Sequence, residues 1–484
     1  MPSADATATT FTYTINSSIT TQWSAGTDWN AVPVSGSATT LFFTGFLGNG
    51  TINTSNNDIG PFLLNSLSIS ATGPNSGASG LIISGSALNF VANSGTAPSV
   101  ISVLSGSTLP AIVISNPIVL GGNLTVDISP TSGATTLSGV VSGTDTLTKT
   151  GPGTLVLSVS TGNNTFTGDT RIAAGAIELG NVEALVGSTL DMQTADTGSV
   201  TFGIPGVHTY KFGGLKGTRG IDNAGNTLSI GGNGQSTTYS GVLSGTGGLV
   251  KTGTDALTLT GTSTYSGPTT VTSGSLILDG RLTGSNVTVQ SGGLFGGTGS
   301  IAGDLTVGGT LSPGSTPGGI GGLTISGSVT LQNGATTLLG VTGSSTFDEI
   351  IGTGAAFTND GALVLSIDSS GTFANGTTFD MIHGFTAPHQ GGFDTAHMFA
   401  TAAYAGLNNT AMSNATFYGP DVWASDWVNS DGNGQNGQRF LFDQTTGTLE
   451  LVPEPSTWAL AAIAAATVGA ARWRRRRRPG RATV

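Results

Sequence analysis

The chain contains an internal repeat. Residues 138–158 (SGVVSGTDTLTKTGPGTLVLS) and 240–260 (SGVLSGTGGLVKTGTDALTLT) align without gaps, and twelve of the twenty-one aligned positions are identical. The similarity resumes between residues 164–179 and 263–278, after a short difference in length. Self-similarity at a fixed spacing is typical of stacked repeats, because one unit cannot bury its apolar face alone. The chain is therefore expected to form an elongated array rather than one globular core.

The repeated units alternate apolar residues with hydroxyl-bearing residues. LTVDIS at residues 124–129 and LTLT at residues 257–260 place Leu, Val or Ile at every second position. This period of two indicates strands that bury one face, and the body lacks the sustained 3.6-residue period of an amphipathic helix. Glycine, with 78 residues, supplies corners where the chain changes direction. The pattern predicts an all-β fold, a right-handed parallel β-helix (β-solenoid) whose coils stack about 4.8 Å apart.

The repeats also resemble a known family. Both copies contain a G-x-G-x-L-x-L pattern or a close variant, then an aromatic residue before a glycine, then a glycine before a final strand. This pattern resembles the autotransporter-associated β-strand repeat, which implies a passenger-like protein at the cell surface but specifies no activity. The second copy departs from the pattern at Asp255 and Ser263. The first copy matches at Gly151, Gly153, Leu155, Leu157, Asn164, Thr165, Phe166, Gly168, Thr170 and Gly175.

Four segments are expected along the chain. Residues 1–62 are predicted to form an N-terminal β cap, closed by the aromatic residues at 23, 29, 42 and 43, and residues 63–345 to form the parallel β-helix with repeats at 138–179 and 240–278. Residues 346–450 are expected to form a β-rich C-terminal cap, because exposed coil ends carry unpaired strands. Residues 451–484 form a separate tail.

Charge and cysteine content exclude several classes of protein. Only 8% of the residues are charged, and the chain before its C-terminal arginine cluster holds eight basic against 26 acidic residues. A surface so poor in cations is unsuited to phosphate backbones, so no nucleic-acid partner is expected. The absence of cysteine excludes disulfides, thiolate metal sites and cysteine nucleophiles.

The tail has three parts. The uncharged segment Trp458–Ala471 would span about 21 Å as a helix, which is shorter than a stable membrane span prefers, and a tryptophan lies at or just beyond each of its ends. Prolines keep the segment before it extended: Val452, Pro453, Glu454, Pro455 and Ser456. A basic stop follows it: Arg472, Arg474, Arg475, Arg476, Arg477 and Arg478.

This tail resembles the PEP-CTERM sorting signal, matched residue by residue at Pro453, Glu454 and Pro455. The resemblance implies an exosortase-type membrane transpeptidase as partner, transient contact with the inner membrane, cleavage near the motif, and a mature protein on the cell surface or in the biofilm matrix. Members of this family usually begin with a secretory signal peptide, which the first ten residues (MPSADATATT) do not form. We therefore expect either that the natural start lies upstream of Met1 or that the sequence has been trimmed, since a leaderless protein would leave the tail without purpose.

No catalytic, cofactor or metal site is expected. Acidic residues of the predicted helix are scattered singly, whereas polysaccharide lyases and hydrolases need clustered carboxylates. His383, His389 and His397 show no metal-binding spacing. We expect a structural protein of the surface or matrix rather than an enzyme. An adhesin or carbohydrate-binding protein that contacts extracellular polysaccharide is the first alternative, and a β-helical polysaccharide lyase or hydrolase is the second.

Overall fold

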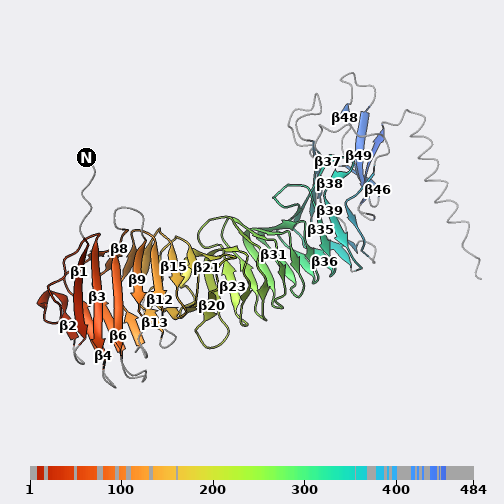
Figure 1. Cartoon of the computed structure of the whole chain (residues 1–484). Helices are drawn as coiled ribbons and strands as arrows, with labels where there is room; N and C mark the ends of the chain where they lie inside the picture. The colour runs from red at the N-terminus through yellow and green to blue at the C-terminus, as the bar shows by residue number, and fades with distance from the viewer. Residues whose placement is uncertain are drawn as a thin grey trace, which may run out of the picture.

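The protein is described by a computed structural model covering residues 8–453, with gaps. The gaps are residues 16–19, 48–51, 73–79, 93–97, 105–110, 130–133, 160–161, 355, 368–377, 386–389, 392–394, 401–415, 420–421, 425–427, 430–436, 444–445 and 447. Within the described residues, all elements are strands except one 3-10 turn, η1 (Trp23–Ala25). Figure 1 shows these strands stacked into an elongated, bent rod, with the N-terminus at one end.

One parallel ladder runs through the whole rod. Each of its strands pairs in parallel with the next, for example Phe11 with Leu41 and Leu41 with Leu67. The strands are β1 (Thr9–Ile15), β3 (Thr39–Phe46), β6 (Ser66–Thr72), β9 (Ser99–Val103), β12 (Leu124–Ile128), β15 (Leu147–Thr150), β17 (Thr170–Ile172), β19 (Leu185–Met192), β21 (Thr209–Gly217), β24 (Thr237–Tyr239), β27 (Ala256–Leu259), β29 (Thr269–Leu278), β31 (Val287–Gly297), β34 (Thr310–Pro313), β37 (Thr336–Gly343), β41 (Ala362–Ile367) and β45 (Thr395–Ala400). The parallel β-solenoid expected from the repeats is confirmed.

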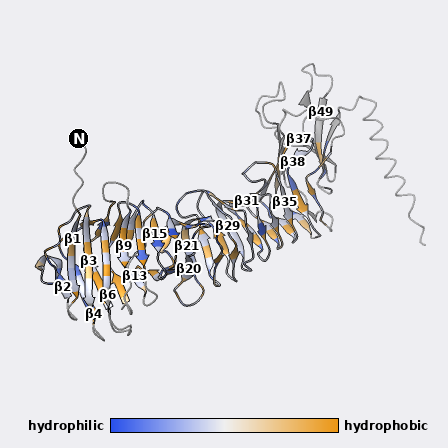
Figure 2. Cartoon of the chain, in the orientation of Figure 1, coloured by the Kyte–Doolittle hydropathy of each residue, from blue (hydrophilic) through white to orange (hydrophobic). Residues whose placement is uncertain are grey.

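Two further parallel ladders complete the coils in the N-terminal half. The second contains β2 (Thr20–Gln22), β4 (Ile52–Asn57), β7 (Gly80–Gly85), β10 (Ala111–Ile114), β13 (Thr135–Leu137), β16 (Thr154–Leu157), β18 (Ala176–Leu179) and β20 (Ser199–Phe202). The third contains β5 (Phe62–Leu64), β8 (Leu88–Phe90), β11 (Ile118–Leu120) and β14 (Val141–Gly143). Each coil turns its alternate apolar side chains inward, and Figure 2 shows these orange residues repeating from strand to strand. Each fully buried Leu, Ile or Val contributes about 1.5–3 kcal/mol.

The solenoid begins earlier than expected. β1 and β3 belong to the same ladder as β6, so the predicted boundary after residue 62 does not separate a cap from the helix. The physical reason is that TTFTYTI and TTLFFTGF already alternate apolar and hydroxyl residues as the later coils do. Trp23 and Trp29 are buried at this end, whereas Phe42 is only half-buried on the outer side of β3.

The solenoid also continues beyond the expected boundary at residue 346. β37, β41 and β45 pair in parallel across it. An antiparallel sheet then follows, made of β42 (Thr378–Asp380), β50 (Thr448–Pro453), β49 (Gly437–Asp443), β47 (Val422–Ala424), β46 (Thr416–Gly419) and β48 (Val428–Asn429). Its buried side chains include Phe379, Phe442 and Leu449. The change from parallel to antiparallel pairing marks the end of the repeating architecture.

A helix able to cross a membrane is not found among the described residues. The expected membrane segment Trp458–Ala471 and the arginines after it lie outside the described residues.

Candidate functional site

The expected sorting motif falls at the end of the described chain. Val452 and Pro453 are the last residues of β50, opposite Arg439 and Gln438 of β49. Glu454, Pro455 and Ser456 lie outside the described residues. The motif therefore remains a prediction.

The asparagine of the first repeat connects successive coils. Asn164 is buried; its Oδ1 accepts a hydrogen bond from the Val141 amide at 2.8 Å, and its Nδ2 donates to the Ala184 carbonyl at 2.9 Å. In the second repeat Ser263 occupies the aligned position, and its Oγ accepts from the Leu243 amide at 3.3 Å. The departure from the family pattern thus keeps the first of the two contacts. These repeat residues build the coil rather than a binding cleft.

Two lysines point into the core instead of toward water. The alternation of β15 places Leu147 and Lys149 inward, and β26 (Leu249–Lys251) places Lys251 inward in the second repeat. Both side chains are at most 1% exposed. Burial lowers the pKa of each ammonium group to about 8, opposed weakly by Asp127 and Asp255 respectively. The inward position could have been read from the L-T-K alternation in the sequence.

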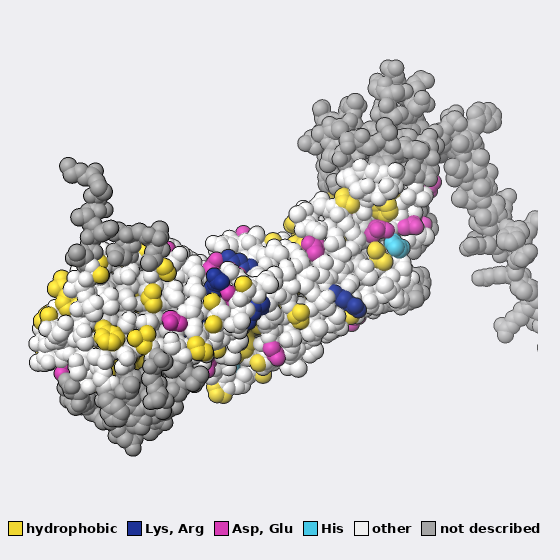
Figure 3. Space-filling model, in the orientation of Figure 1, with side chains coloured by type: hydrophobic (Ala, Val, Ile, Leu, Met, Phe, Trp, Pro, Cys, Tyr) yellow, Lys and Arg dark blue, Asp and Glu magenta, His cyan; other side chains and the backbone are white. Residues whose placement is uncertain are grey.

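A group of charged side chains, called the charged belt, extends from the end of the first repeat toward the second. It consists of Arg171, Lys211, Lys216 and Arg219 with the carboxylates of Asp169, Glu183, Asp191 and Asp196. Figure 3 shows the lysines and arginines gathered near the middle of the rod, among acidic side chains. Apart from this belt, Arg281 is the remaining cation that reaches the surface in the part of the chain whose side chains the structure describes.

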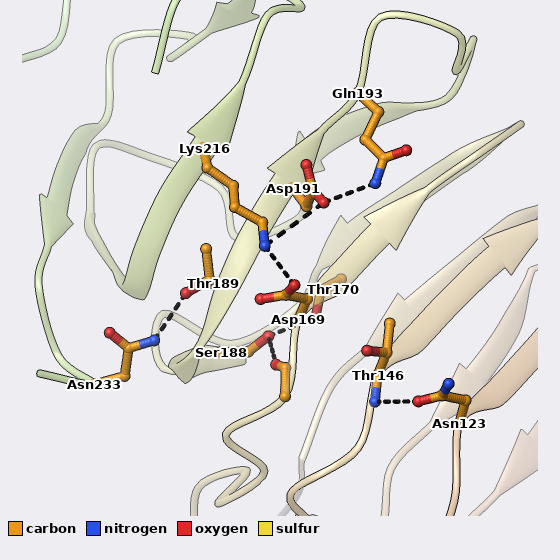
Figure 4. A network of polar contacts seen from close by, with 11 residues as sticks. Asn123, Thr146, Asp169, Thr170, Ser188, Thr189, Asp191, Gln193, Lys216 and Asn233 are labelled. Atoms are coloured by element: carbon orange, nitrogen blue, oxygen red, sulfur yellow. Dashed lines mark hydrogen bonds and ion pairs between the residues drawn. The ribbon is translucent and has the colours of Figure 1, made fainter. Parts of the chain in front are cut away.

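Strand register brings the belt together. Arg171 of β17 lies opposite Asp191 of β19, which lies opposite Lys216 of β21. Lys216 Nζ lies 2.5 Å from Asp169 Oδ2 and 3.8 Å from Asp191 Oδ2, as Figure 4 shows. The side-chain amide of Gln193 donates to Asp191 at 2.8 Å. The signs of charge therefore alternate along the outer face of three successive coils.

The strongest pair of the belt is bidentate. Arg171 donates two hydrogen bonds to Asp196, from Nε at 2.9 Å and from Nη2 at 2.7 Å. The Asp196 side chain is only 3% exposed, and its hydrogen bond is the main cause that raises the pKa of Arg171. Lys211 pairs with Glu183 in a more exposed position. Each of the four carboxylates of the belt therefore lies within 4 Å of a lysine or arginine nitrogen, and Asp169 and Asp191 share Lys216.

A second group of titratable side chains lies near the C-terminal end. Asp348 is buried and accepts hydrogen bonds from the Gly321 and Gly340 amides, both at 2.7 Å. Desolvation raises the pKa of this carboxyl group to about 7, although the two amide bonds oppose the shift. The next residue is Glu349, in β39 (Glu349–Gly352). Its Oε1 lies 3.2 Å from Nε2 of His383, in β43 (Ile382–His383). His389 lies outside the described residues, and for His397 only its backbone place in β45 is described.

No group of histidine and acidic residues that could hold a metal ion occurs among the described residues. His208 contacts the Pro205 carbonyl at 2.9 Å, and His383 contacts a carboxylate. The polar side chains of this region therefore do two things. Buried ones form hydrogen bonds with backbone groups of neighbouring coils, and those of the belt place charges on the surface.

The fold and its repeated contacts define a repeat protein built of stacked parallel β coils. Residues 147–179 and 249–278 match the family described as passenger-associated-transport-repeat, which covers the coils that contain both buried lysines.

Two curated proteins are similar to parts of the chain. The adhesin BmaC autotransporter of Brucella suis biovar 1 (strain 1330) is 49% identical over 84 residues, which is 16% of this chain and 2% of the adhesin. An extracellular serine protease of Serratia marcescens is 33% identical over 133 residues, which is 27% of this chain and 12% of the protease. The chain thus matches only a small part of each relative's length.

Proposed function

We propose that this chain is an exported structural protein of the cell surface or extracellular matrix. The observation that carries the proposal is the continuous parallel ladder from β1 to β45, which includes two passenger-associated repeats. Such a rod can extend away from the cell and present its side faces there, and this role needs no catalytic site. The similarity to an autotransporter adhesin supports a surface location.

The proposed role is not enzymatic. The four carboxylates of the charged belt, which would be the candidates for acid–base catalysis, are held by lysine or arginine. The similarity to the serine protease covers 12% of that protein, a fraction consistent with shared repeats. A nucleic-acid partner is not proposed, because the whole chain carries a net charge of −11.

The proposed route to the surface uses the C-terminal tail. The V-P-E-P-S motif would be bound in extended form by an exosortase-type transpeptidase of the inner membrane, with Trp458–Ala471 as a transient membrane stop. The chain beyond about Ser456 would then be left behind. The precursor would be membrane-associated and the mature form extracellular.

Mass spectrometry of the exported form tests this route in cells that contain an exosortase. We expect no peptide that extends through Arg472, and we expect P453A/P455A to leave the uncut precursor in the membrane fraction. T457A, next to the motif, is the control and should mature normally. Normal maturation of the double variant would remove the motif's proposed role.

Carbohydrate binding is a second candidate, favoured by a column of threonines on the outer face. Thr270 pairs with Thr288, Thr288 with Thr306, Thr306 with Thr330, and Thr330 with Thr358, so five successive coils present hydroxyl groups. The residues of this column carry no charge, so its partner would be a neutral extracellular polysaccharide. Binding of neutral glycans that T288V/T306V weakens would support this candidate, and the absence of binding to a glycan array would leave the structural role alone.

A further inference from the structure

The two buried lysines make the same set of contacts in the two repeats. Lys149 Nζ donates to the carbonyls of Thr150 at 2.5 Å and Gly151 at 2.9 Å in its own coil, and of Ala174 at 3.4 Å in the next coil. Lys251 Nζ makes the aligned contacts, to Thr252 at 2.5 Å, Gly253 at 3.5 Å and Ser273 at 3.5 Å. Each ammonium group therefore joins the corners of two consecutive coils.

A glycine in the next coil makes room for each lysine ammonium group. Gly175 and Gly274, at the corner of the following coil, have φ angles of 72° and 65°, in the left-handed region that favours glycine. A Cβ atom at either position would lie 2.9 Å from the lysine Nζ and closer still to backbone carbonyl oxygens. The lysine thus requires a particular corner in the next coil, not merely an apolar neighbour.

The immediate neighbours of each lysine in its inward column are apolar and do not by themselves distinguish one coil from another. Lys149 stands between Val126 and Ile172 in the ladder. Lys251 stands between Ile230 and Val271. If a coil were skipped during stacking, Val and Ile side chains would still face one another, because the alternation of the strands would be preserved. In a skipped stacking the Lys149 ammonium group would keep the two carbonyls of its own coil but lose the third, which the next coil supplies, so a buried charge would lose a hydrogen bond.

We propose that Lys149 and Lys251 are register lysines, which determine the coil that stacks on the coil carrying them. Their function is conformational specificity within a nearly uniform array. Each favours the native stacking through a hydrogen bond to a backbone carbonyl of the neighbouring corner, Ala174 for Lys149 and Ser273 for Lys251. The inference is independent of the proposed export and of any ligand.

The absence of cysteine allows the register to be measured with engineered disulfides. Val156 lies opposite Glu178 in the native ladder, and Glu178 lies opposite Thr201 in the following coil. Adjacent parallel strands are about 4.8 Å apart, within the 4.4–6.8 Å range of Cα separations that a disulfide spans, whereas two steps of about 9.6 Å are not. V156C/E178C therefore reports the native register, and V156C/T201C reports a skipped coil.

The test refolds each cysteine pair in the otherwise unchanged full chain and in K149M, and quantifies the disulfide by non-reducing electrophoresis and peptide mass spectrometry. We expect K149M to raise the V156C/T201C disulfide about fivefold or more, because a bias of 1–2 kcal/mol between two stackings changes their ratio by that factor. K211M, which removes an exposed lysine, is the charge-matched control and should leave this disulfide at background.

The proposal is overturned if, in the K149M background, V156C/E178C forms its disulfide and V156C/T201C stays at background. The lysine would then only stabilise the fold, even if K149M changed the unfolding midpoint. If K149M does not fold, K251M provides the same test in the second repeat. There Val250 lies opposite Thr270, and Thr270 opposite Thr288, so V250C/T270C reports the native register and V250C/T288C the skipped one. The same outcomes support or overturn the inference.

Discussion

At the scale of single residues, the inward lysines make stability depend on pH in an unusual direction. Both lysines have a pKa of about 8 in the folded chain, against about 10.5 when unfolded. Below pH 8 both states bind the protons, whereas between pH 8 and pH 10.5 the unfolded chain binds more of them. The free energy of unfolding therefore rises with pH across this window, by up to about 1.4 kcal/mol per pH unit for each lysine.

Two buried tyrosines limit this increase in the free energy of unfolding at high pH. Burial raises the pKa of Tyr265 to about 12 and raises that of Tyr239 as well. Above pH 10 an unfolded tyrosine loses its proton while the folded one keeps it, so stability falls again. We expect the urea midpoint to be highest near pH 10, and K149M/K251M to abolish the rise above pH 8. A midpoint that is flat or falls from pH 8 to pH 10 in the unmodified chain would contradict the burial of charged lysines.

At the scale of elements, the belt links β17, β19 and β21 through ion pairs that are expected to contribute unequally to the free energy of unfolding. R171M leaves the Asp196 carboxylate, 3% exposed, without its bidentate partner. We expect a loss of about 1–3 kcal/mol, the usual cost of an unsatisfied buried group. K211M, which breaks a pair whose lysine is 48% exposed, should cost less than about 1 kcal/mol. Chemical denaturation of both variants measures the difference, and equal losses would show that burial of Asp196 does not matter.

The same strands show what could be predicted from the sequence. Alternation within a strand is local, so the inward place of Leu147 and therefore of Lys149 follows from the sequence. The pair between Lys216 and Asp169 could not be predicted, because 47 residues separate them and the lengths of the intervening corners set the register. The start of the solenoid at Thr9 does not follow from the sequence, because the tryptophans of the first coils are also typical of a separate cap.

At the scale of the whole molecule, sixteen successive parallel pairings from β1 to β45 give the ladder a length of roughly 75–80 Å at about 4.8 Å each. Each coil contacts mainly its neighbours, so stability is close to a sum of local terms. The ends of such a rod decide whether it associates with other copies, because an end strand presents unpaired backbone groups.

At the N-terminal end the chain covers its own edge strand. The Asn30 amide donates to the Thr12 carbonyl and the Thr14 amide to the Asp28 carbonyl, both at 2.9 Å, on the open side of β1. Between these two bonds Trp29 packs edge-on against Tyr13, with ring centroids 5.2 Å apart. It also meets Trp23 and Phe43, at 5.5 and 5.4 Å. The indole ring therefore holds residues 28–30 over the edge.

Removal of this ring is expected to expose the edge. W29A leaves a cavity that costs about 3–5 kcal/mol, enough to release residues 28–30 locally. This release would free the Thr14 amide and also the Thr12 amide, which donates to Asn30 Oδ1 at 2.8 Å. We expect faster hydrogen exchange at those two amides, and association that increases with protein concentration in sedimentation velocity. W29F is the matched control, because it keeps an aromatic ring and removes an indole N–H that is buried without a partner. If W29A sediments like the unmodified protein at every concentration, the covered edge is not what prevents end-to-end association of the rods.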